Sequence, residues 1–170
     1  MKHTLVALMQ DRPGVLNRVV SLFRRRGFNI ESLSVGHTET PGVSRMTIVV
    51  DGSQTNVEQV IKQLYRLIEV LKVSDVTHDP TVARELVMVK VHAPASRRAE
   101  INSLATVFEA RIVDVAHDSM ILELCANPDK VENFIDLVRP FGIREMLRTG
   151  RVAMVRGAHA HAGDPYVKVA

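Results

Sequence analysis

The chain has 170 residues, of which 46% are hydrophobic, and it carries a formal net charge of +3. This length is enough for one ordinary domain or two small ones. The aromatic content is 4% and there is no tryptophan, and the lysines and arginines are scattered, which argues against binding of nucleic acid. The N-terminus lacks the pattern of a signal peptide, and no apolar run approaches the roughly 20 residues of a membrane span. We therefore expect a cytoplasmic protein that does not enter membranes.

The only cysteine, Cys125, lies in a stretch that alternates in polarity like a strand. A single cysteine excludes a disulfide framework within the chain and fits a reducing compartment. We interpret Cys125 as a small buried hydrophobic residue, in preference to a reactive thiol.

The first half of the chain is predicted to contain four strands and two helices. They are predicted at residues 4–9 (strand), 14–26 (helix), 29–37 (strand), 43–51 (strand), 54–66 (helix) and 69–76 (strand). Gly27 ends the first helix, and three arginines at 24–26 complement the negative end of its dipole. We interpret these arginines as a solvated helix end, in preference to a phosphate-binding patch.

The second half repeats the same order. Its elements are predicted at residues 85–92 (strand), 96–109 (helix), 111–117 (strand), 120–126 (strand), 129–139 (helix) and 142 to about 155 (strand). This double β-α-β-β-α-β order predicts an α+β fold of two ferredoxin-like units. In each unit, both helices cover one face of an antiparallel four-stranded sheet.

The composition along the chain indicates where these units begin and end. We expect a first domain over residues 1–78, a linker over 79–83, a second domain over 84–156 and a flexible tail over 157–170. His159 and His161 in the tail make only a weak metal site, so no functional metal is expected.

The first strand is apolar on both faces. Leu5, Ala7 and Met9 alternate with Thr4, Val6 and Leu8. Since helices cover only one face of the sheet, the open face or an edge of the first unit is expected to meet another subunit. A homodimer is the natural arrangement.

The turn between the first strand and the first helix is the most informative segment. A polar stretch, residues 10–13, ends the strand, and Gly14 opens the helix. Such a turn directs free backbone N–H groups at its mouth, where a small carboxylate can bind. Because no nucleophile or general base lies nearby in the sequence, the turn predicts a receptor for a small anionic or zwitterionic molecule.

A family resemblance sharpens this prediction. Residues 11–19 resemble the ligand-site turn of ACT domains, small amino-acid-sensing modules with the same element order. The likeness continues through residues 23–35, 44–49 and 59–64. Together with the second ferredoxin-like unit, these segments resemble the regulatory small subunits of acetolactate synthase (acetohydroxyacid synthase) over about residues 1–156.

The resemblance implies a function. Such subunits bind branched-chain amino acids, chiefly valine, pass feedback inhibition to a separate catalytic subunit, and raise its activity. Thiamine diphosphate, Mg²⁺ and FAD would be held by that catalytic subunit, and no cofactor is expected in this chain. No catalysis by the chain alone is expected either.

The resemblance also implies where the effector binds. In ACT dimers of this type, the turn of one subunit faces strand residues of its partner. The residues at the matching positions are Asp11, Gly14, Val15, Leu16, Asn29 and Ile30. The amides around the glycine would hold the carboxylate, Asn29 would read the ammonium or carboxylate, and Ile30, Leu16 and Val35 would line an aliphatic pocket.

Each of these residues also has a purely structural interpretation. Gly14 is open to a role in the turn alone, Asp11 to capping or a turn hydrogen bond, Asn29 to the strand edge and Ile30 to the core. In the second unit the equivalent turn, residues 93–96, has no glycine opening the helix. That unit is therefore expected to support dimerisation or contacts with the catalytic subunit.

Three other functions remain as alternatives. An enzyme would use acid–base groups, but the candidates are spread without catalytic or metal-ligand spacing. They are His37, His78, His92, His117, Glu85, Asp114 and Asp118. A ligand-sensing transcription factor would need a DNA-binding segment, and none is evident. The last alternative is an ACT-type sensor of another amino acid that regulates a different enzyme or transcription.

Overall fold

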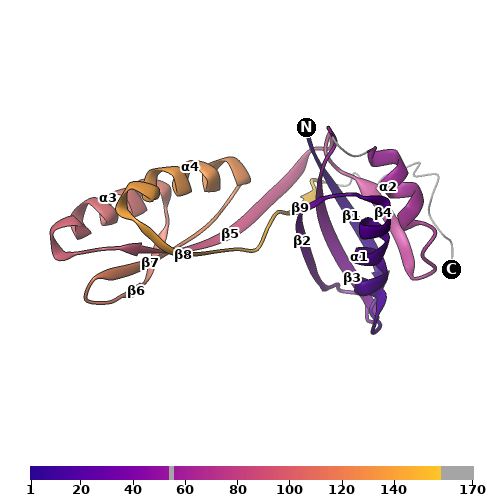
Figure 1. The fold of residues 1–170 in the computed structure, drawn as a ribbon, viewed down its shortest axis with the longest axis horizontal. Helices are drawn as coiled ribbons and strands as arrows, with labels where there is room; N and C mark the ends of the chain where they lie inside the picture. Colours follow the sequence, from indigo (N-terminus) through magenta and orange to yellow (C-terminus); the bar gives the residue numbers. More distant parts are fainter. Residues whose placement is uncertain (54–55, 158–170) are drawn as a thin grey trace. The chain divides into compact units, whose positions relative to one another are not determined.

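The computed structural model describes residues 1–53 and 56–157, and the predicted tail with its two histidines lies outside this part. The described chain forms two compact units. The first unit contains residues 1–82 and 151–157, and the second unit contains residues 83–150. The expected fold, two βαββαβ units with antiparallel sheets, is confirmed (Figure 1).

The first unit packs two helices on one face of a four-stranded antiparallel sheet with strand order β2-β3-β1-β4 (Figure 1). Its elements are β1 (Lys2–Gln10), α1 (Val15–Arg26), β2 (Ile30–His37), β3 (Val43–Asp51), α2 (Val57–Leu64) and β4 (Val70–Asp75). Alternate residues of β1 and β3, such as Leu5 and Ile48, pack against Val19 and Phe23 of α1 and Leu64 of α2. This packing holds α1 against the sheet and thereby positions the start of the helix.

Local signals set the helix ends. Gly14 precedes α1 in the left-handed region, with φ of 88°, where a side chain would be strained. At the other end, the Gly27 and Phe28 amides donate to the carbonyls of Arg24 and Phe23. The N-cap of α2 is Asn56, whose side chain accepts from the backbone N–H of Gln59 at 3.1 Å.

The second unit has the same plan, with strand order β6-β7-β5-β8. Its elements are β5 (Thr81–His92), α3 (Arg98–Phe108), β6 (Arg111–Val115), β7 (Ser119–Ala126), α4 (Pro128–Val138) and β8 (Ile143–Arg148). Short 3₁₀ turns precede α3 and follow α4, at Ala95–Arg97 and Arg139–Phe141. Residues of β5 and β7, including Val89 and Leu122, face Phe134 of α4 in the core.

The last strand predicted from the sequence is divided into two strands in the structure. The prediction of one strand over 142–155 was wrong, because β8 ends at Arg148 and β9 (Val152–Val155) follows separately. Strand β9 pairs with β5, whose start at residue 81 lies within the expected linker. Residues 151–157 follow the second unit in the sequence but pack with the first unit.

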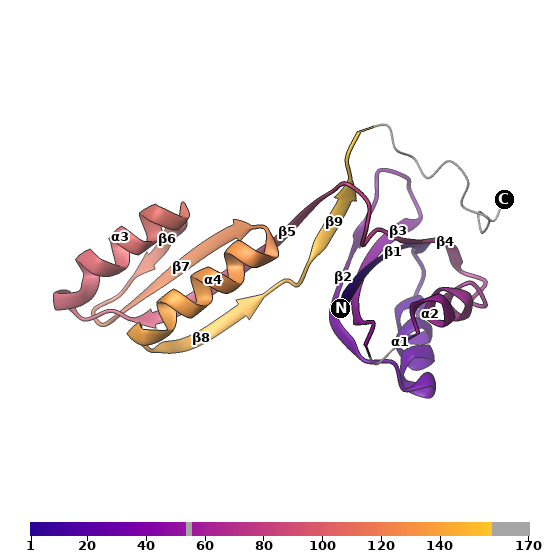
Figure 2. The same cartoon turned by 90° about the horizontal axis from the view of Figure 1, so that it is seen from above.

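The C-terminal segment covers the sheet face that the sequence left open. Thr4 and Val6 of β1 are 3% and 7% exposed, although they face away from the helices. Arg45 donates to the Ala153 carbonyl at 2.7 Å, and Arg151 donates to the Thr4 hydroxyl at 3.0 Å. Figure 2 shows β9 on the side of the sheet opposite α1 and α2. The chain itself therefore covers part of this face of the sheet.

The expected burial of Cys125 was wrong, because its side chain is exposed. In β7, Leu122 and Leu124 point into the core, so the alternation of the strand turns Cys125 to the opposite face. Within the described residues, no helix is long and apolar enough to cross a bilayer.

Candidate functional site

The turn between β1 and α1 is held by backbone hydrogen bonds. The Asp11 amide donates to the Gly42 carbonyl at 2.8 Å, which ties the turn to the loop between β2 and β3. The Arg12 amide donates to Gln10, and the Val15 amide donates to the Arg12 carbonyl at 3.3 Å. The turn is therefore built before any ligand binds.

The start of α1 keeps unpaired donors. In the described chain, the amides of Gly14, Leu16 and Asn17 have no hydrogen-bond acceptor. No side chain caps the helix, and its first turn holds no acidic residue. Because the N–H groups and the helix dipole both favour negative charge, this helix end is suited to a carboxylate. The Val15 amide, expected among the donors, is engaged in the turn, whereas the Asn17 amide was not expected.

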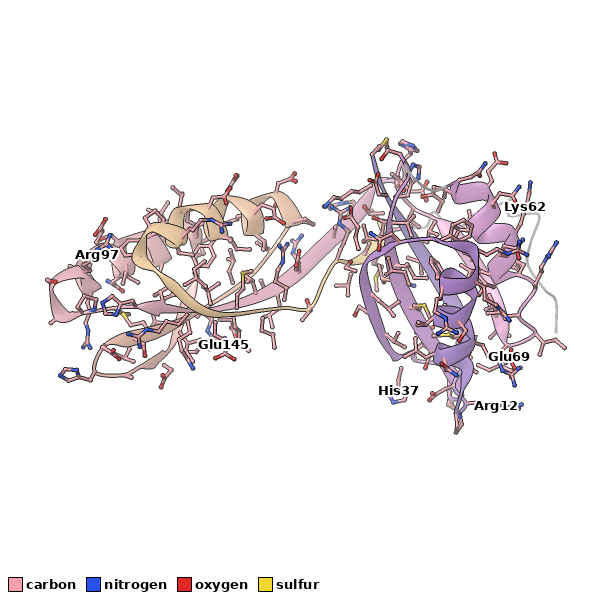
Figure 3. All side chains as sticks on the ribbon, viewed as in Figure 1. Arg12, His37, Lys62, Glu69, Arg97 and Glu145 are labelled. Carbon is pink, nitrogen blue, oxygen red and sulfur yellow. The ribbon has the colours of Figure 1, made fainter. Side chains whose placement is uncertain are left out.

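A histidine that sequence reasoning did not place at this site lies beside the turn. The Asp11 carboxylate is 3.0 Å from His37 Nδ1, at the end of β2. Figure 3 shows His37 at the same end of the first unit as Arg12 and Glu69. The Gln10 amide donates to the Glu69 carbonyl, and the Glu69 side chain pairs with Arg18 of α1. These contacts fix the start of α1 against β2 and β4.

The apolar candidates divide into core and surface. Val15 is 5% exposed and belongs to the core, so its side chain is not free to line a pocket. Ile30 is half-buried and packs against the same core. Leu16 and Val35 are 42% and 41% exposed, so their side chains are accessible to a ligand or another subunit.

The structure separates Asn29 from the turn. In the β3 ladder, Gln10 pairs with Val43, whereas Ile30 pairs with Val50. The two positions are thus seven residue steps apart along β3, which is roughly 23 Å at about 3.3 Å per residue. The exposed Asn29 lies at the far end of the sheet from Asp11 and Gly14. Within one copy of the chain, these candidate residues do not meet.

Comparison with known proteins relates both units to one family. Residues 5–72 match the model of the AHAS small subunit-like ACT domain, and residues 84–157 match that of the small subunit of acetolactate synthase. The chain is 59% identical over 157 residues to a probable acetolactate synthase small subunit of Archaeoglobus fulgidus, covering 92% of this chain and 98% of that protein. The chain belongs to the acetolactate synthase small subunit family.

Other members of this family agree. The acetolactate synthase small subunit of Bacillus subtilis is 45% identical over 165 residues, which is 96% of each chain. The crystal structure of the acetolactate synthase small subunit from Thermotoga maritima superposes with a TM-score of 0.83 at 40% identity, covering 92% of this chain and 98% of that one. The resemblance seen in the sequence is confirmed, and the chain is a regulatory small subunit with an ACT domain.

The second unit of this small subunit is built differently at the equivalent turn. Its first helical turn is 3₁₀, and the preceding Pro94 is extended. The Arg98 guanidinium donates to the carbonyls of Ala93, Ala116 and His117, at 3.2, 2.7 and 2.7 Å. An arginine thus ties together the turn and the β6–β7 loop, with no left-handed glycine opening the helix. Among the described residues, no cluster of three or more histidine, cysteine or acidic side chains is arranged to hold a metal ion.

Proposed function

We propose that this regulatory subunit binds a branched-chain amino acid, chiefly valine, at a site that two copies of the chain complete. The bound effector confers feedback inhibition on the catalytic large subunit of acetolactate synthase, and the regulatory subunit also activates that partner. Thiamine diphosphate, Mg²⁺ and FAD belong to the catalytic subunit, and this chain contributes no catalytic residue. The complex works in the cytoplasm.

The observation that carries this proposal is that the free amides at the start of α1 and the Asn29 side chain lie too far apart in one copy to hold the same amino acid. The amides of Gly14, Leu16 and Asn17 are ready to hold a carboxylate. An amino acid also needs an acceptor for its ammonium group, and the acceptor of Asn29 lies at the other end of the sheet. A second copy supplies it.

The free edge of the sheet indicates how the copies meet. Strand β2 lies at the edge, and only β3 pairs with it among the described strands. If two β2 strands pair antiparallel about a two-fold axis, the start of one lies beside the end of the other. Asn29 of one copy then lies next to His37 and the adjoining turn of its partner. The backbone groups of both edges are also satisfied.

Side-chain selection would come from exposed aliphatic residues. Leu16 follows the free Gly14 amide, and Val35 lies on β2 near the same end. Both are large apolar side chains more than 40% exposed, and a branched aliphatic ligand would bury them. Since one methylene changes binding by about 1–3 kcal/mol, leucine and isoleucine compete with valine at such a site.

Inhibition requires that the effector favours one arrangement of the assembly over another. An effector that bridges two copies stabilises the arrangement in which both halves of its site meet. A typical coupling of about 1–3 kcal/mol changes affinity between sites by about 5–150-fold.

Gly14→Asp tests the site. The new carboxylate lies at the amides that hold the effector, so we expect valine inhibition of the reconstituted enzyme to be lost while activation of the catalytic subunit is retained. Titration calorimetry of the variant with valine, leucine and isoleucine should show binding weakened by at least about tenfold.

The matched control is Gly142→Asp in the second unit. Gly142 also has a positive φ, of 89°, so an aspartate there is strained as well, but Gly142 lies in the other unit, which does not contain the turn. This control should keep valine inhibition. Unchanged valine sensitivity of the Gly14 variant would overturn the proposed site.

A further inference from the structure

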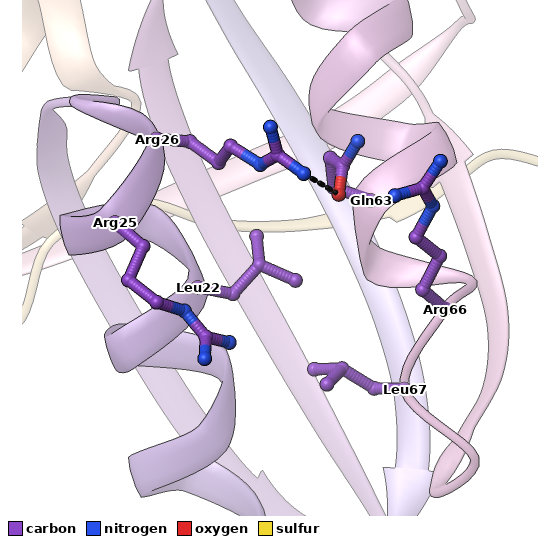
Figure 4. Close-up of a pocket in the computed structure, with 6 residues that line it drawn as sticks. All are labelled: Leu22, Arg25, Arg26, Gln63, Arg66 and Leu67. Carbon is purple, nitrogen blue, oxygen red and sulfur yellow. Dashed lines mark hydrogen bonds between the residues drawn. The ribbon is translucent and has the colours of Figure 1, made fainter.

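A hollow of about 460 Å³ lies between the two helices of the first unit, on the side away from the sheet. Its lining residues come from the second half of α1, the end of α2 and the turn that follows α2, as Figure 4 shows: Leu22, Arg25, Arg26, Gln63, Arg66 and Leu67. This volume is within the range of small-ligand sites. The hollow contains none of the residues of the proposed effector site.

Three guanidinium groups line this hollow without a carboxylate. Arg26 donates to the Gln63 side chain at 3.2 Å, and no ion pair to Arg25, Arg26 or Arg66 occurs in the described part of the chain. Figure 4 shows Arg26 of α1 and Arg66, from the turn after α2, reaching toward Gln63, with Arg25 beside Leu22. Three like charges gathered on one hollow repel one another unless an anion lies between them.

The floor of the hollow explains why these arginines differ from a solvated helix end. Leu22 is 4% exposed and Gln63 is 9% exposed, so buried side chains form the bottom of the hollow. The buried Gln63 carboxamide holds the Arg26 guanidinium in place and has donors of its own. Arg66 comes from after α2, so the dipole at the end of α1 does not account for its presence.

The geometry points to a second ligand site here, for a small anion with two or more phosphate groups. Guanidinium groups match phosphate oxygens in two-point hydrogen bonds, and three of them suit a polyphosphate better than a single carboxylate. No aromatic side chain lines the hollow, so the phosphates themselves provide the recognition. The site lies at the end of α1 that is distant from Gly14, so two ligands would act on one helix.

Calorimetry of the full chain with sodium tripolyphosphate, pyrophosphate and orthophosphate in about 0.15 M salt tests this site, since that salt screens exposed charges beyond about 8 Å. We expect tripolyphosphate and pyrophosphate to bind saturably at one site per chain, and orthophosphate and citrate to bind at least about tenfold more weakly. Citrate separates phosphate recognition from general attraction of anions. Equal binding of citrate, or no saturable heat with tripolyphosphate, would overturn the proposal.

Variants locate the binding. Arg66→Ala and Arg26→Ala should each weaken tripolyphosphate binding by about tenfold or more, because each removes charge-assisted hydrogen bonds. Arg24→Ala is the matched control, since Arg24 lies in the same last turn of α1 with the same charge but outside the lining. The affinity of the Arg24→Ala variant for tripolyphosphate should change by less than about twofold. Equal losses in Arg24→Ala and Arg66→Ala would contradict the site.

A further variant keeps the test independent of folding. Gln63→Glu places a carboxylate among the guanidiniums and should abolish tripolyphosphate binding while circular dichroism and valine binding stay unchanged. If Gln63→Glu folds and still binds tripolyphosphate with the affinity of the unsubstituted chain, the anion does not lie in this hollow.

Discussion

Individual residues in the first unit take their roles from neighbours that are distant in the sequence. Gly14 was predictable, because a glycine that opens a helix after a polar turn indicates both a positive φ and free amides. The contact between Asp11 and His37 was not predictable, because 26 positions separate them and only the β2–β3 hairpin brings them to 3.0 Å. Val15 matched the motif, yet its side chain belongs to the core. A motif therefore locates a backbone site more reliably than it assigns side chains.

Asp75 illustrates how local partners set stability. Burial works to raise the pKa of Asp75, but hydrogen bonds from the Thr77 side chain, His3 and the Thr77 amide outweigh it, and the pKa is lowered overall. A carboxyl whose pKa is lower in the folded chain stabilises the fold above its unfolded pKa of about 3.9. That contribution is lost as the pH falls through the folded value.

Asp75→Asn should therefore lower the free energy of unfolding by about 1 kcal/mol at pH 7. The difference from the unsubstituted chain should shrink as the pH falls below about 4. Urea unfolding at pH 7, 5 and 3 measures it. Asp136→Asn is the control, because Asp136 is 72% exposed and its pair with Arg139 contributes little. A difference in the free energy of unfolding that stays constant down to pH 3 would contradict a stabilising role for the Asp75 charge.

At the scale of elements, an ion-pair cluster joins three parts of the second unit. Arg148 of β8 donates to Glu85 of β5 at 2.6 and 3.0 Å and to Glu132 of α4 at 2.7 Å. Glu85 is 4% exposed, and the hydrogen bonds to Glu85, helped by Glu132, raise the pKa of Arg148 despite its partial burial. The cluster therefore holds an edge strand and a helix to the centre of the sheet.

Arg148→Met should destabilise the chain by about 2 kcal/mol, because it leaves the buried Glu85 carboxylate without its partner. Breaking a fully buried pair costs about 3–5 kcal/mol, and the expected loss is smaller because Arg148 is about a third exposed. Thermal and urea unfolding measure this loss. Arg144→Met breaks the exposed pair with Asp118 and should have a clearly smaller effect. Equal effects of the two substitutions would show that the burial of Glu85 does not matter.

The order of elements was predictable from the sequence, whereas the division of the last predicted strand into two was not. Twelve segments show periodicity strong enough to reveal both units, and the structure places a helix or strand at each. An alternating pattern over residues 142–155 fits one long strand as well as two short ones. The choice depends on partners elsewhere in the chain: β9 pairs with β5, and Ala153 accepts from Arg45, 108 positions away. Local pattern carries no information about such contacts.

At the scale of the whole molecule, strand register decides which site is possible. The sequence placed Asn29 and Gly14 in one effector site through family resemblance, and the ladder along β3 places them at opposite ends of the sheet. Among the described strands β2 has one free edge, and the proposed site uses this edge for the contact with a second copy. The proposed regulatory site is thus a property of the dimer rather than of the single chain.

Mixed dimers test this most directly. Gly14→Asp alters the turn and Asn29→Ala alters the strand, so each homodimer has two defective sites and should bind valine at least about tenfold more weakly than the unsubstituted dimer. A dimer with one chain of each kind combines the intact turn of one chain with the intact strand of the other. Calorimetry of purified mixed dimers should then show one valine site of unsubstituted affinity per dimer. Mixed dimers that bind no valine would contradict a site shared between two copies.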